Sequence, residues 1–565
     1  MRAIVVSPNG VAIACVDPAD VDERAMPTVW WGSPAAAAEQ VAEIERTEGP
    51  RWAMWSQDSA RELLELGVEV ARSWDVAAVH RVLFGGWRAD PARAWARIGG
   101  LSTRDLPADA PLDLFHQEPD GDPDDPVRPD GHLRPDWVAG AWQETPERAG
   151  RWATVLAELV RRQRAAIEEL ADREDGRPAA RRTASSESTA ELLCAELGHA
   201  GLPVDRTAME AAIASFVGPR PASEREAVER VVARDEAVLR HVPQGIRFDL
   251  RSPTQVRSML RVVGVEVPDT RAWRLEQHRD AHPLVDALLT WRKAERVATT
   301  FGYPWLDERL GADGRFRGEW SAADGAAGRM TASGGLHNMP ADLRSGVVAA
   351  PGHRFVRADL GQIEPRVLAA VSGDRSLARA SQADDLYAPV AAELGVERAV
   401  AKVAVLGAMY GQTTGEGARA LQGLRRSYPI AMSYLEAADA TAQVGTDLRT
   451  YGGRLLRMGG PVPVERAQAA ARGRFGRNAM VQGAAAELFK VWALIVRARG
   501  RSVDAEVVLC LHDELLVHVP DEHVEVAASM VDEALGEAAA RWAPDRSVRF
   551  LSDTSIVRSW ADAKP

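Results

Sequence analysis

The stretch FVRADLGQIEPRVLAAVSGD, residues 355–374, changes its hydrophobic period at an acidic residue. Its first four residues, Phe355 to Ala358, predict a short strand, Asp359 stands where that strand ends, and a helical pattern follows. A strand that runs into a helix predicts a fold of mixed helices and strands. A single acid in this position is most often a helix N-cap or a turn residue, so its meaning depends on the rest of the chain.

A second stretch, EVVLCLHDELLVHVP (residues 506–520), predicts two apolar strands joined in a hairpin. The tip of this hairpin carries His512, Asp513 and Glu514. Carboxylates are hard oxygen ligands that suit Mg²⁺, which takes its other ligands from water and from substrate phosphates. Two such ions can activate an attacking hydroxyl and stabilise a leaving pyrophosphate. If the fold brings Asp359 and Asp513 together, the pair predicts a metal site for phosphoryl transfer.

A third stretch, ERAVAKVAVLGAMYGQ (residues 397–412), is helical by composition. Arg398, Lys402, Leu406 and Tyr410 recur every four residues, so they share one stripe of the helix. Two cations followed by an aromatic ring suit a surface that grips a triphosphate and covers a base pair. The alternative is an amphipathic helix whose basic residues face solvent.

Length and composition restrict the class of protein. The chain has 565 residues, 46% of them hydrophobic and 27% charged, which predicts two or more soluble domains. It has no run of 18 apolar residues and no secretory signal, so we expect no membrane span. Three cysteines lie far apart, as expected in a reducing cytoplasm. The net charge of −12 alone argues against a nucleic-acid partner, but a basic groove can coexist with acidic outer faces.

Patterns along the chain predict its organisation. Residues 1–110 alternate strand-like and helical runs, as in an α/β domain, beginning with a strand pair at the N-terminus. Residues 116–136 are rich in Pro, Gly and Asp and predict an exposed loop. Residues 145–300 are mainly helical, and the second half of the chain mixes helices with a few strands.

The order of these motifs resembles that of family A (DNA polymerase I-like) DNA polymerases, and the resemblance covers roughly residues 180–565. The family's conserved blocks are matched in order, by 328–340 (the TGRLSSxxPNLQNIP stretch), 359–366 (motif A), 398–411 (motif B), 474–483 (the helix along the primer–template minor groove) and 512–514 (motif C).

The resemblance implies a DNA-directed DNA polymerase of α+β class, with a right-hand polymerase of palm, fingers and thumb behind an RNase H-like exonuclease-like domain. It implies two Mg²⁺ ions, or Mn²⁺ in their place, held by Asp359 and Asp513 with support from Glu514. It also implies primer–template DNA and dNTPs as partners, and a monomer in the cytoplasm, associated with the nucleoid. The pathway it implies is DNA repair or replication gap filling.

The resemblance also assigns residues to the substrates. Arg398 and Lys402 bind the phosphates, and Lys402 also protonates the leaving pyrophosphate. Glu364, hydrogen-bonded by Tyr410, occupies the place of a ribose 2′-hydroxyl and so excludes ribonucleotides. The other residues assigned to the nucleotide pocket are Gln362, Ile363, Tyr387 and Leu406. The residues assigned to DNA are Arg329, Asn338, Arg366, Arg474, Asn478, Gln482 and His512.

Several positions depart from the family pattern without touching a metal ligand. Leu406 replaces an aromatic residue, so the ring over the incoming sugar is missing. Tyr387 replaces a histidine, which removes a cationic phosphate contact. The remaining departures are Leu360-Gly361 for Tyr-Ser, Pro365 for Leu and His337 for Gln.

The N-terminal region lacks the acids that a proofreading exonuclease of this family needs. The hairpin NGVAIACVDPADVDE has no Asp-x-Glu at its strand end, no Tyr-xxx-Asp pair follows later, and only Asp58 or Asp75 could match a required carboxylate. We therefore expect that proofreading is lost. The layout resembles the short family A polymerases of actinobacteria. The expected domains are 1–175 (degenerate exonuclease-like), 176–320 (thumb and start of the palm), 321–385 (palm), 386–470 (fingers) and 471–565 (palm).

Two other functions share part of this pattern. A single-subunit RNA polymerase has the same palm acids and the Lys…Tyr helix, but Glu364 leaves no room for a 2′-hydroxyl. A catalytically silent primer–template binding protein would keep the fold alone. The joint retention of five residues argues against it: Asp359, Asp513, Arg398, Lys402 and Tyr410.

Overall fold

The computed structural model describes residues 1–16, 29–104, 106–107, 121–173, 179–411, 416–460 and 465–563. These residues form two compact units, each of which gathers segments that are distant in sequence. The first unit consists of Met1–Ala200, Glu319–Ala332 and Arg354–Ile556. The second consists of Gly201–Gly318, Ser333–His353 and Val557–Pro565. The expected domain boundaries divide the chain differently, since helix α7 (Ala179–Ala200) belongs to the first unit.

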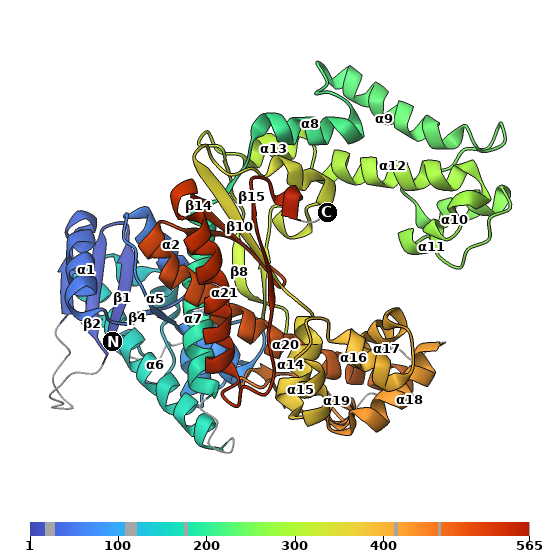
Figure 1. Cartoon of the computed structure of the whole chain (residues 1–565). Coiled ribbons are helices and arrows are strands. Elements are labelled where there is room, and N and C mark those ends of the chain that lie inside the picture. The colour runs from blue at the N-terminus through green and yellow to red at the C-terminus, as the bar shows by residue number, and fades with distance from the viewer. Residues whose placement is uncertain are drawn as a thin grey trace, which may run out of the picture. The chain divides into compact units, whose positions relative to one another are not determined.

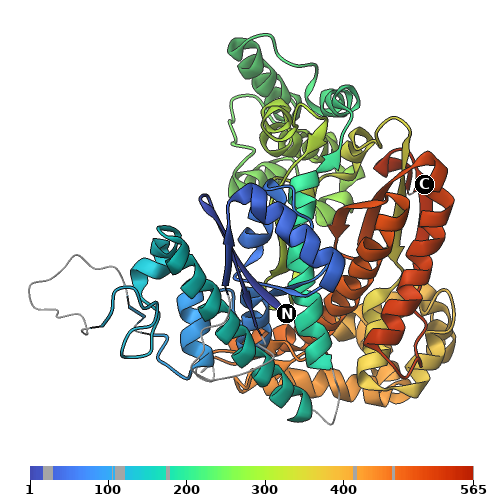
Figure 2. The same cartoon turned by 90° about the vertical axis from the view of Figure 1, so that its left-hand side faces the viewer.

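The N-terminal part of the first unit is a five-stranded sheet in the order β3-β2-β1-β4-β5. Its strands β1 to β5 are Arg2–Ser7, Gly10–Cys15, Val29–Gly32, Trp52–Met54 and Ser73–Asp75. The first three strands pair antiparallel, and β4 and β5 add in parallel. Figure 2 shows this blue domain toward the viewer. The α/β pattern and the N-terminal strand pair are confirmed for the residues described, while its kinship to an exonuclease stays a prediction.

Both faces of this sheet are covered, because successive side chains of a strand point to opposite faces. Ile4 and Val6 pack toward helices α1 (Pro34–Glu48) and α2 (Gln57–Glu65). Ala3 and Val5 pack toward α3 (Val76–Phe84) and α6 (Pro146–Arg173). Helix α4 (Pro91–Ile98) follows α3, and α5 (Pro135–Ala139) precedes α6.

The predicted loop at 116–136 is only partly an exposed loop. Its residues 116–120 lie outside the described residues, and from 121 the chain forms turns and a bridge between Val127 and Leu133. Leu133 and Arg134 are both buried. The fold tolerates a buried Arg134 because its guanidinium donates hydrogen bonds to the carbonyls of Asp125 and Asp122 at 2.8 and 3.0 Å. The C-terminal end of this stretch is therefore part of the domain core.

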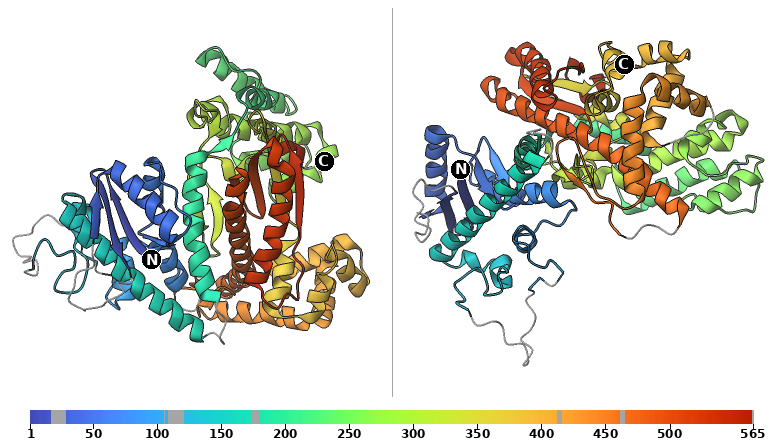
Figure 3. Two further views of the ribbon diagram at one scale, coloured as in Figure 1. Left: turned by 60° about the vertical axis from the view of Figure 1, so that its left-hand side comes forward. Right: turned by 90° about the horizontal axis from the view of Figure 1, so that it is seen from below.

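A second sheet of the first unit has the strand order β13-β14-β10-β15. These strands are Glu506–Leu511, Glu514–Pro520, His353–Leu360 and Ser552–Val557 in that order. Helices α20 (Arg466–Gly500) and α21 (Val524–Trp542) pack against it, as Figures 1 and 3 show in orange-red and dark red. A two-stranded sheet of β8 (Trp320–Asp324) and β9 (Arg329–Ala332) lies beside them. The predicted strand before Asp359 and the predicted hairpin at 506–520 are confirmed.

The helices of residues 363–443 form a cluster of their own, drawn in yellow and orange in Figure 1. They are α14 (Ile363–Ser372), α15 (Arg375–Ala380), α16 (Tyr387–Leu394), α17 (Arg398–Tyr410), α18 (Glu416–Ser427) and α19 (Pro429–Gln443). The Asp374 carboxylate fixes two of them, because it accepts hydrogen bonds from the first amides of α15 at 3.0 Å and of α19 at 3.1 Å. A short hairpin, β11 (Leu448–Arg449) and β12 (Leu455–Leu456), leads to α20.

Helix α20 is the central helix of the first unit. Glycines let α19 approach it closely, since a Cβ added at Gly476 would lie 2.4 Å from the Cβ of Ala442. Among the described residues, Arg466–Val503 is long and apolar enough to span a membrane, with a mean hydropathy of 1.5, but 78% of that apolar window is buried inside the protein. It is therefore a core helix.

The second unit is mainly helical, as predicted for this part of residues 145–300. Its helices are α8 (Arg206–Val217), α9 (Glu224–Leu239), α10 (Pro253–Val262), α11 (Ala272–Glu276), α12 (Pro283–Thr300) and α13 (Tyr303–Arg309). Strands β6 (Leu202–Pro203) and β7 (Arg315–Phe316) pair antiparallel in the same unit. Val238, Val256, Leu284 and Leu288 form its core.

A buried group of charges ties α7 to α20 and to the β11–β12 hairpin. Glu187 accepts hydrogen bonds from Lys490 Nζ at 2.7 Å and forms an ion pair with Arg454. Glu487 lies beside them and accepts hydrogen bonds from the Thr450 hydroxyl and, at 2.8 Å, from the Gly452 amide. Burial raises the pKa of Glu487 to about 7.

We predict that Glu487→Gln stabilises the protein at pH 8 but not at pH 5. The folded-state pKa lies above the ordinary value of 4.5, so the folded protein holds this proton more tightly, and its loss as the pH rises through 7 destabilises the fold. Well above pH 7, the substitution should raise the free energy of unfolding by roughly 3 kcal/mol. Thermal unfolding at both pH values measures it, with exposed Glu533→Gln as the control. Equal effects at the two pH values would contradict a raised pKa.

Candidate active site

The two acids predicted to bind metal lie at the ends of neighbouring strands. Strand β14 lies next to β10, which ends with Asp359 and Leu360. The Leu360 amide donates a hydrogen bond to the Asp513 carbonyl at 2.9 Å. Residues more than 150 positions apart in the chain are thereby brought to one edge of one sheet.

The turn that carries Asp513 is tight. Leu511 pairs directly with Glu514, so only His512 and Asp513 make the hairpin loop. His512 has a φ of +56°, a left-handed conformation that residues other than glycine rarely adopt. Two-residue hairpins require such angles, and strained backbone of this kind gathers at functional sites.

A buried arginine that the sequence analysis did not single out joins the acids. Arg357 is fully buried and lies two residues before Asp359, on the same face of β10. Its guanidinium donates to Asp359 Oδ2 and to Glu514 Oε1, both at 2.7 Å, and to Asp553 Oδ2 at 3.3 Å. Burial opposes this charge, but hydrogen bonds and charges from Glu514, Asp359 and Asp553 raise the pKa of Arg357 above its ordinary value. Charge-assisted bonds of this type fix the orientation of carboxylates.

The donor set at this edge fits a divalent metal bound partly by its substrate. No three His, Cys, Asp or Glu side chains of the described residues gather as a metal site. Glu514, predicted to support the metal, accepts a hydrogen bond from Arg357 through Oε1, and Asp359 accepts one through Oδ2. Asp359 and Asp513 supply carboxylates at this edge, and two such hard oxygen ligands suit Mg²⁺ when phosphates and water complete its shell.

A pocket of about 400 Å³ opens beside Asp513. It brings together most of the residues predicted to contact nucleotide or DNA. Those that line it are Arg329, Gln362, Ile363, Glu364, Tyr387, Lys402, Leu406, Tyr410, Gln482 and His512. Phe489 of α20 also lines it, a residue that the sequence analysis missed.

Helix α17 presents its predicted stripe to this pocket. Ala401, Ala404 and Ala408 are buried on the opposite face, whereas Lys402 is exposed and Leu406 and Tyr410 are only partly buried, so the stripe is not a core stripe. Lys402, Leu406 and Tyr410 all line the pocket. Gly411, at a φ of +69°, ends the helix directly after Tyr410.

Glu364 is held from two sides. The Tyr410 hydroxyl donates to Glu364 Oε2 at 2.8 Å, and Arg329 Nη2 donates to Glu364 Oε1 at 2.9 Å. The predicted Tyr410–Glu364 hydrogen bond is therefore confirmed. Burial, followed by the charge of Glu364, raises the pKa of Tyr410, so its hydroxyl keeps the proton that it donates.

Asp385 is an acid near the site that the sequence analysis did not assign to it. It forms an ion pair with Arg398 of α17 and accepts a hydrogen bond from Gln362 Nε2 at 2.7 Å. Gln362 has a φ of +56° and also accepts a hydrogen bond from the Leu386 amide at 2.8 Å. These contacts hold Gln362 in its left-handed conformation at the start of α14.

The prediction that Arg366 contacts DNA is wrong. Arg366 is fully buried and donates hydrogen bonds to the carbonyls of Gly361, Ser381, Ala383, Asp384 and Arg549. Because these hydrogen bonds of its guanidinium all go to backbone carbonyls, Arg366 has a structural role in positioning α14.

The other residues predicted to contact DNA lie outside the pocket. Arg474 and Asn478 lie on α20, and Asn478 is one turn before Gln482 on the same face. Arg474 packs against Gly411, where an added Cβ would lie 2.7 Å from Arg474 Cγ. Asn338 belongs to the second unit, where its carbonyl accepts a hydrogen bond from Arg296 at 2.7 Å.

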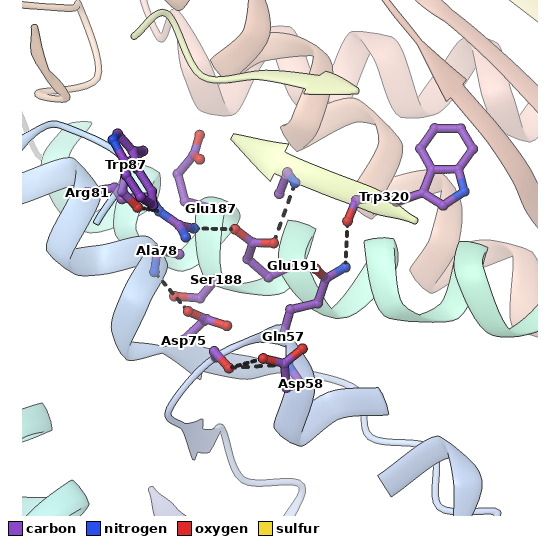
Figure 4. A network of polar contacts seen from close by, with 12 residues as sticks. Gln57, Asp58, Asp75, Ala78, Arg81, Trp87, Glu187, Ser188, Glu191 and Trp320 are labelled. Atoms are coloured by element: carbon purple, nitrogen blue, oxygen red, sulfur yellow. Dashed lines mark hydrogen bonds and ion pairs between the residues drawn. The ribbon is translucent and has the colours of Figure 1, made fainter. Parts of the chain in front are cut away.

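The acids of the N-terminal domain serve helix ends and ion pairs (Figure 4). Asp58 is exposed and forms an ion pair with Arg61 at 2.9 Å. Asp75 is buried and caps α3 by accepting a hydrogen bond from the Ala78 amide at 2.8 Å. Burial and the nearby charge of Glu191 raise the pKa of Asp75 well above its ordinary value. The loss of proofreading stays a prediction, since these contacts describe what the acids do and not an activity.

Comparison with known proteins agrees with this geometry. The model of DNA polymerase family A matches residues 222–562. DNA polymerase I of Chloroflexus aurantiacus is 31% identical over 325 residues, which are 52% of this chain and 34% of that protein. The thermostable DNA polymerase I of Thermus filiformis is 27% identical over 318 residues, 51% of this chain and 38% of that protein. The chain therefore matches little more than a third of the length of these relatives.

A solved structure shares the fold. The polymerase domain of Pol1 from M. smegmatis, in complex with DNA primer–template and dNTP, has a TM-score of 0.71 at 20% sequence identity. The match covers 100% of this chain and 95% of that one.

We predict that Arg357→Met costs about 3–5 kcal/mol of stability, because it removes the guanidinium that pairs with the buried Glu514 carboxylate. Adding Glu514→Leu should recover most of this loss, since replacing both partners of a buried pair by apolar residues is close to neutral. Denaturant unfolding of the unchanged protein, of Arg357→Met and of the double variant measures the free energies of unfolding. The half-exposed Arg354, paired with Asp521 at 3.2 Å, gives the control Arg354→Met, for which less than about 1 kcal/mol is expected. A double variant no more stable than the single one would contradict this role of Arg357.

Proposed function

This chain belongs to DNA polymerase family A, and we propose that it catalyses template-directed DNA synthesis by adding dNTPs to a primer 3′-hydroxyl. The observation that carries the proposal is the meeting of Asp359 and Asp513 at one sheet edge beside the pocket lined by Lys402 and Tyr410. The relatives named above are all DNA polymerases, which supports the proposal, and so does the solved polymerase domain in complex with primer–template and dNTP.

In this proposal Asp359 and Asp513 hold two divalent ions, Mg²⁺ or Mn²⁺. When bound, such ions activate the attacking hydroxyl and stabilise the leaving pyrophosphate. The protein's own part is to hold the carboxylates in place, and Arg357 does so through its bonds to Asp359 and Glu514. Positioning and charge stabilisation account for most of the catalysis in phosphoryl transfer.

The phosphates of the nucleotide lie along α17. Lys402 is exposed on the pocket side of that helix and binds them as a compact cation, and it supplies the proton for the leaving pyrophosphate. Arg398, one turn earlier, is paired with Asp385 and exchanges this partner for phosphate oxygens when the nucleotide binds.

The sugar lies beside Glu364. With both of its oxygens engaged by Tyr410 and Arg329, this carboxylate is held rigidly where a 2′-hydroxyl would have to fit. Leu406 supplies no ring above the sugar, so the aromatic side chains left in the pocket are Tyr387, Tyr410 and Phe489. This arrangement favours a DNA polymerase over a single-subunit RNA polymerase.

We also propose a role for the N-terminal domain and a cellular setting for the protein. The N-terminal domain provides no 3′–5′ proofreading, which the helix-capping role of Asp75 and the exposed ion pair of Asp58 support. The protein acts as a monomer in the cytoplasm, in DNA repair or in filling replication gaps.

Asp513→Asn should reduce primer extension by more than about 100-fold, since even outer-shell partners of a metal site are worth 10–100-fold. The assay is extension of a labelled primer on a template with Mg²⁺ and dNTPs. Asp521→Asn, which changes an acid just beyond the end of β14, should stay within about twofold of the unchanged protein. A protein that binds primer–template but never extends it would support the silent binding protein instead.

Glu364→Ala should raise the incorporation of ribonucleotides relative to deoxyribonucleotides by at least about tenfold, because it removes the group that occupies the place of the 2′-hydroxyl. Single-nucleotide incorporation with matched dNTP and rNTP measures the ratio. Tyr410→Phe, which removes one hydrogen bond and keeps the carboxylate, should change the ratio less. A wild-type preference for ribonucleotides would contradict the assignment.

A further inference from the structure

A second pocket, of about 410 Å³, lies in the first unit and contains none of the residues of the candidate active site. One wall is formed by α3, α4 and the segment between them, and the other by residues that flank the β11–β12 hairpin, Asp447 before it and Arg457 and Gly459 after it. The side chains that matter for its chemistry are His80, Trp87, Arg88, Arg93, Arg97 and Arg457.

The two walls are built to fit one another. A Cβ added at Gly85 would lie 2.8 Å from the Leu455 carbonyl, and Gly85 has a φ of +65°, so this close approach requires glycine. Arg457 Nε donates to the Phe84 carbonyl at 2.5 Å, and Arg449 Nη2 donates to the Leu83 carbonyl at 3.2 Å. The pocket is thus a fixed feature of the fold.

The lining is strongly cationic although the whole chain carries a net charge of −12. Arg88 and Arg97 lie over the rings of Trp87 and Phe84, at 5.1 and 5.3 Å, and neither they nor Arg457 form an ion pair within the part of the chain that the structure describes. Asp447 is the acid among the lining residues, and its carboxylate accepts a hydrogen bond from the Met458 amide at 2.8 Å. Unpaired guanidinium groups around a hollow are suited to phosphate.

Two buried nitrogen atoms of this pocket lack a hydrogen-bond partner. His80 is 2% exposed and its Nδ1 has none, and Arg93 Nε has none, although Asp90 lies 3.7 Å away. Native proteins leave few buried polar atoms in this state. Burial, followed by the charge of Arg457, lowers the pKa of His80 to about 4, so its ring is neutral at pH 7 and can donate one N–H. Anionic oxygens bound in the pocket are acceptors of the kind that these two nitrogens lack.

The rim of the pocket offers a flat aromatic surface. Trp87 is 77% exposed, which is unusual for so large an apolar side chain on a folded protein. An exposed ring next to arginines is the arrangement on which nucleobases stack in proteins that bind single strands.

We propose that this pocket binds a phosphate joined to a nucleobase, with the phosphate between His80, Arg93, Arg97 and Arg457 and the base against Trp87. Its volume falls in the range of small-ligand pockets. The ligand to which we commit is single-stranded DNA, because Trp87, Arg88 and Arg97 lie at an open rim where a strand can continue past the pocket. The choice of DNA over other nucleotides rests on the proposed function, whereas the phosphate-and-base chemistry does not.

A binding assay tests the proposal without any DNA synthesis. Fluorescence anisotropy of a labelled single-stranded 12-mer of thymidine, without dNTPs or divalent metal, gives the affinity over a range of salt concentrations. Arg97→Glu with Arg457→Glu should weaken binding by at least about tenfold, and should lower the slope of log K against log salt by about 1.4, or 0.7 for each lost phosphate contact. Trp87→Ala should weaken it by about fivefold or more. Arg46→Glu, an exposed change on α1, is the matched control and should stay within about twofold.

Photo-crosslinking places the strand. A 12-mer containing 5-iodouracil should crosslink to Trp87, as read by peptide mass spectrometry, and 5-iodo-dUMP tests the free nucleotide as the source. A crosslink from the nucleotide and none from the strand would keep the phosphate-and-base site but make a free nucleotide its ligand. Unchanged affinity in both variants together with no crosslink at Trp87 would overturn the proposal. Because neither assay needs polymerisation, a failure here and a failure of primer extension are separate results.

Discussion

The site depends on one interaction between distant strands, the placement of β14 beside β10 with the Leu360 amide bound to the Asp513 carbonyl. Side chains alternate along a strand, so a shift of one residue in this register would send one of the two acids to the other face of the sheet. The elements that complete the pocket continue from the same edge. Helix α14 starts three residues after Leu360 and carries Glu364, and the hairpin tip supplies His512.

Arg357 shows how this edge tolerates so much negative charge. Asp359, Glu514 and Asp553 would repel one another, and one buried guanidinium bonds to all three. Asp385 likewise binds two side chains at once, because it pairs with Arg398 and accepts a hydrogen bond from Gln362. At Arg357 the ion pairs orient the carboxylate of Asp359 at the sheet edge, and at Asp385 a hydrogen bond orients Gln362, which lines the pocket, so these two side chains are in place before any ligand arrives. Preorganised charge of this kind is the main means by which enzymes stabilise transition states.

The local sequence pattern predicted the helices and strands that carry the site. The features that it did not predict depend mainly on contacts between residues distant in the chain. The strand before Asp359, the hairpin at 506–520 and the stripe of α17 have periods that the sequence displays. Arg357 could have been found from the same period, because it lies two residues before Asp359 on one strand. Arg366 could not be placed correctly, since its carbonyl partners include Ser381 and Arg549, far away in sequence. The second pocket, lined by Trp87 and several arginines, joins residues near 85 to residues near 457, and no local pattern indicates that these segments meet.

The proposed chemistry requires that Asp359 and Asp513 hold divalent metal together. A crystal structure with Mn²⁺, primer–template and a non-hydrolysable dNTP analogue, recorded for anomalous scattering, tests it most directly. We expect anomalous density within bonding distance of both carboxylates and of the nucleotide phosphates, with Glu514 still bound to Arg357. Density that contacts only one of the two acids, or that lies away from this sheet edge, would show that the two carboxylates do not share the metal.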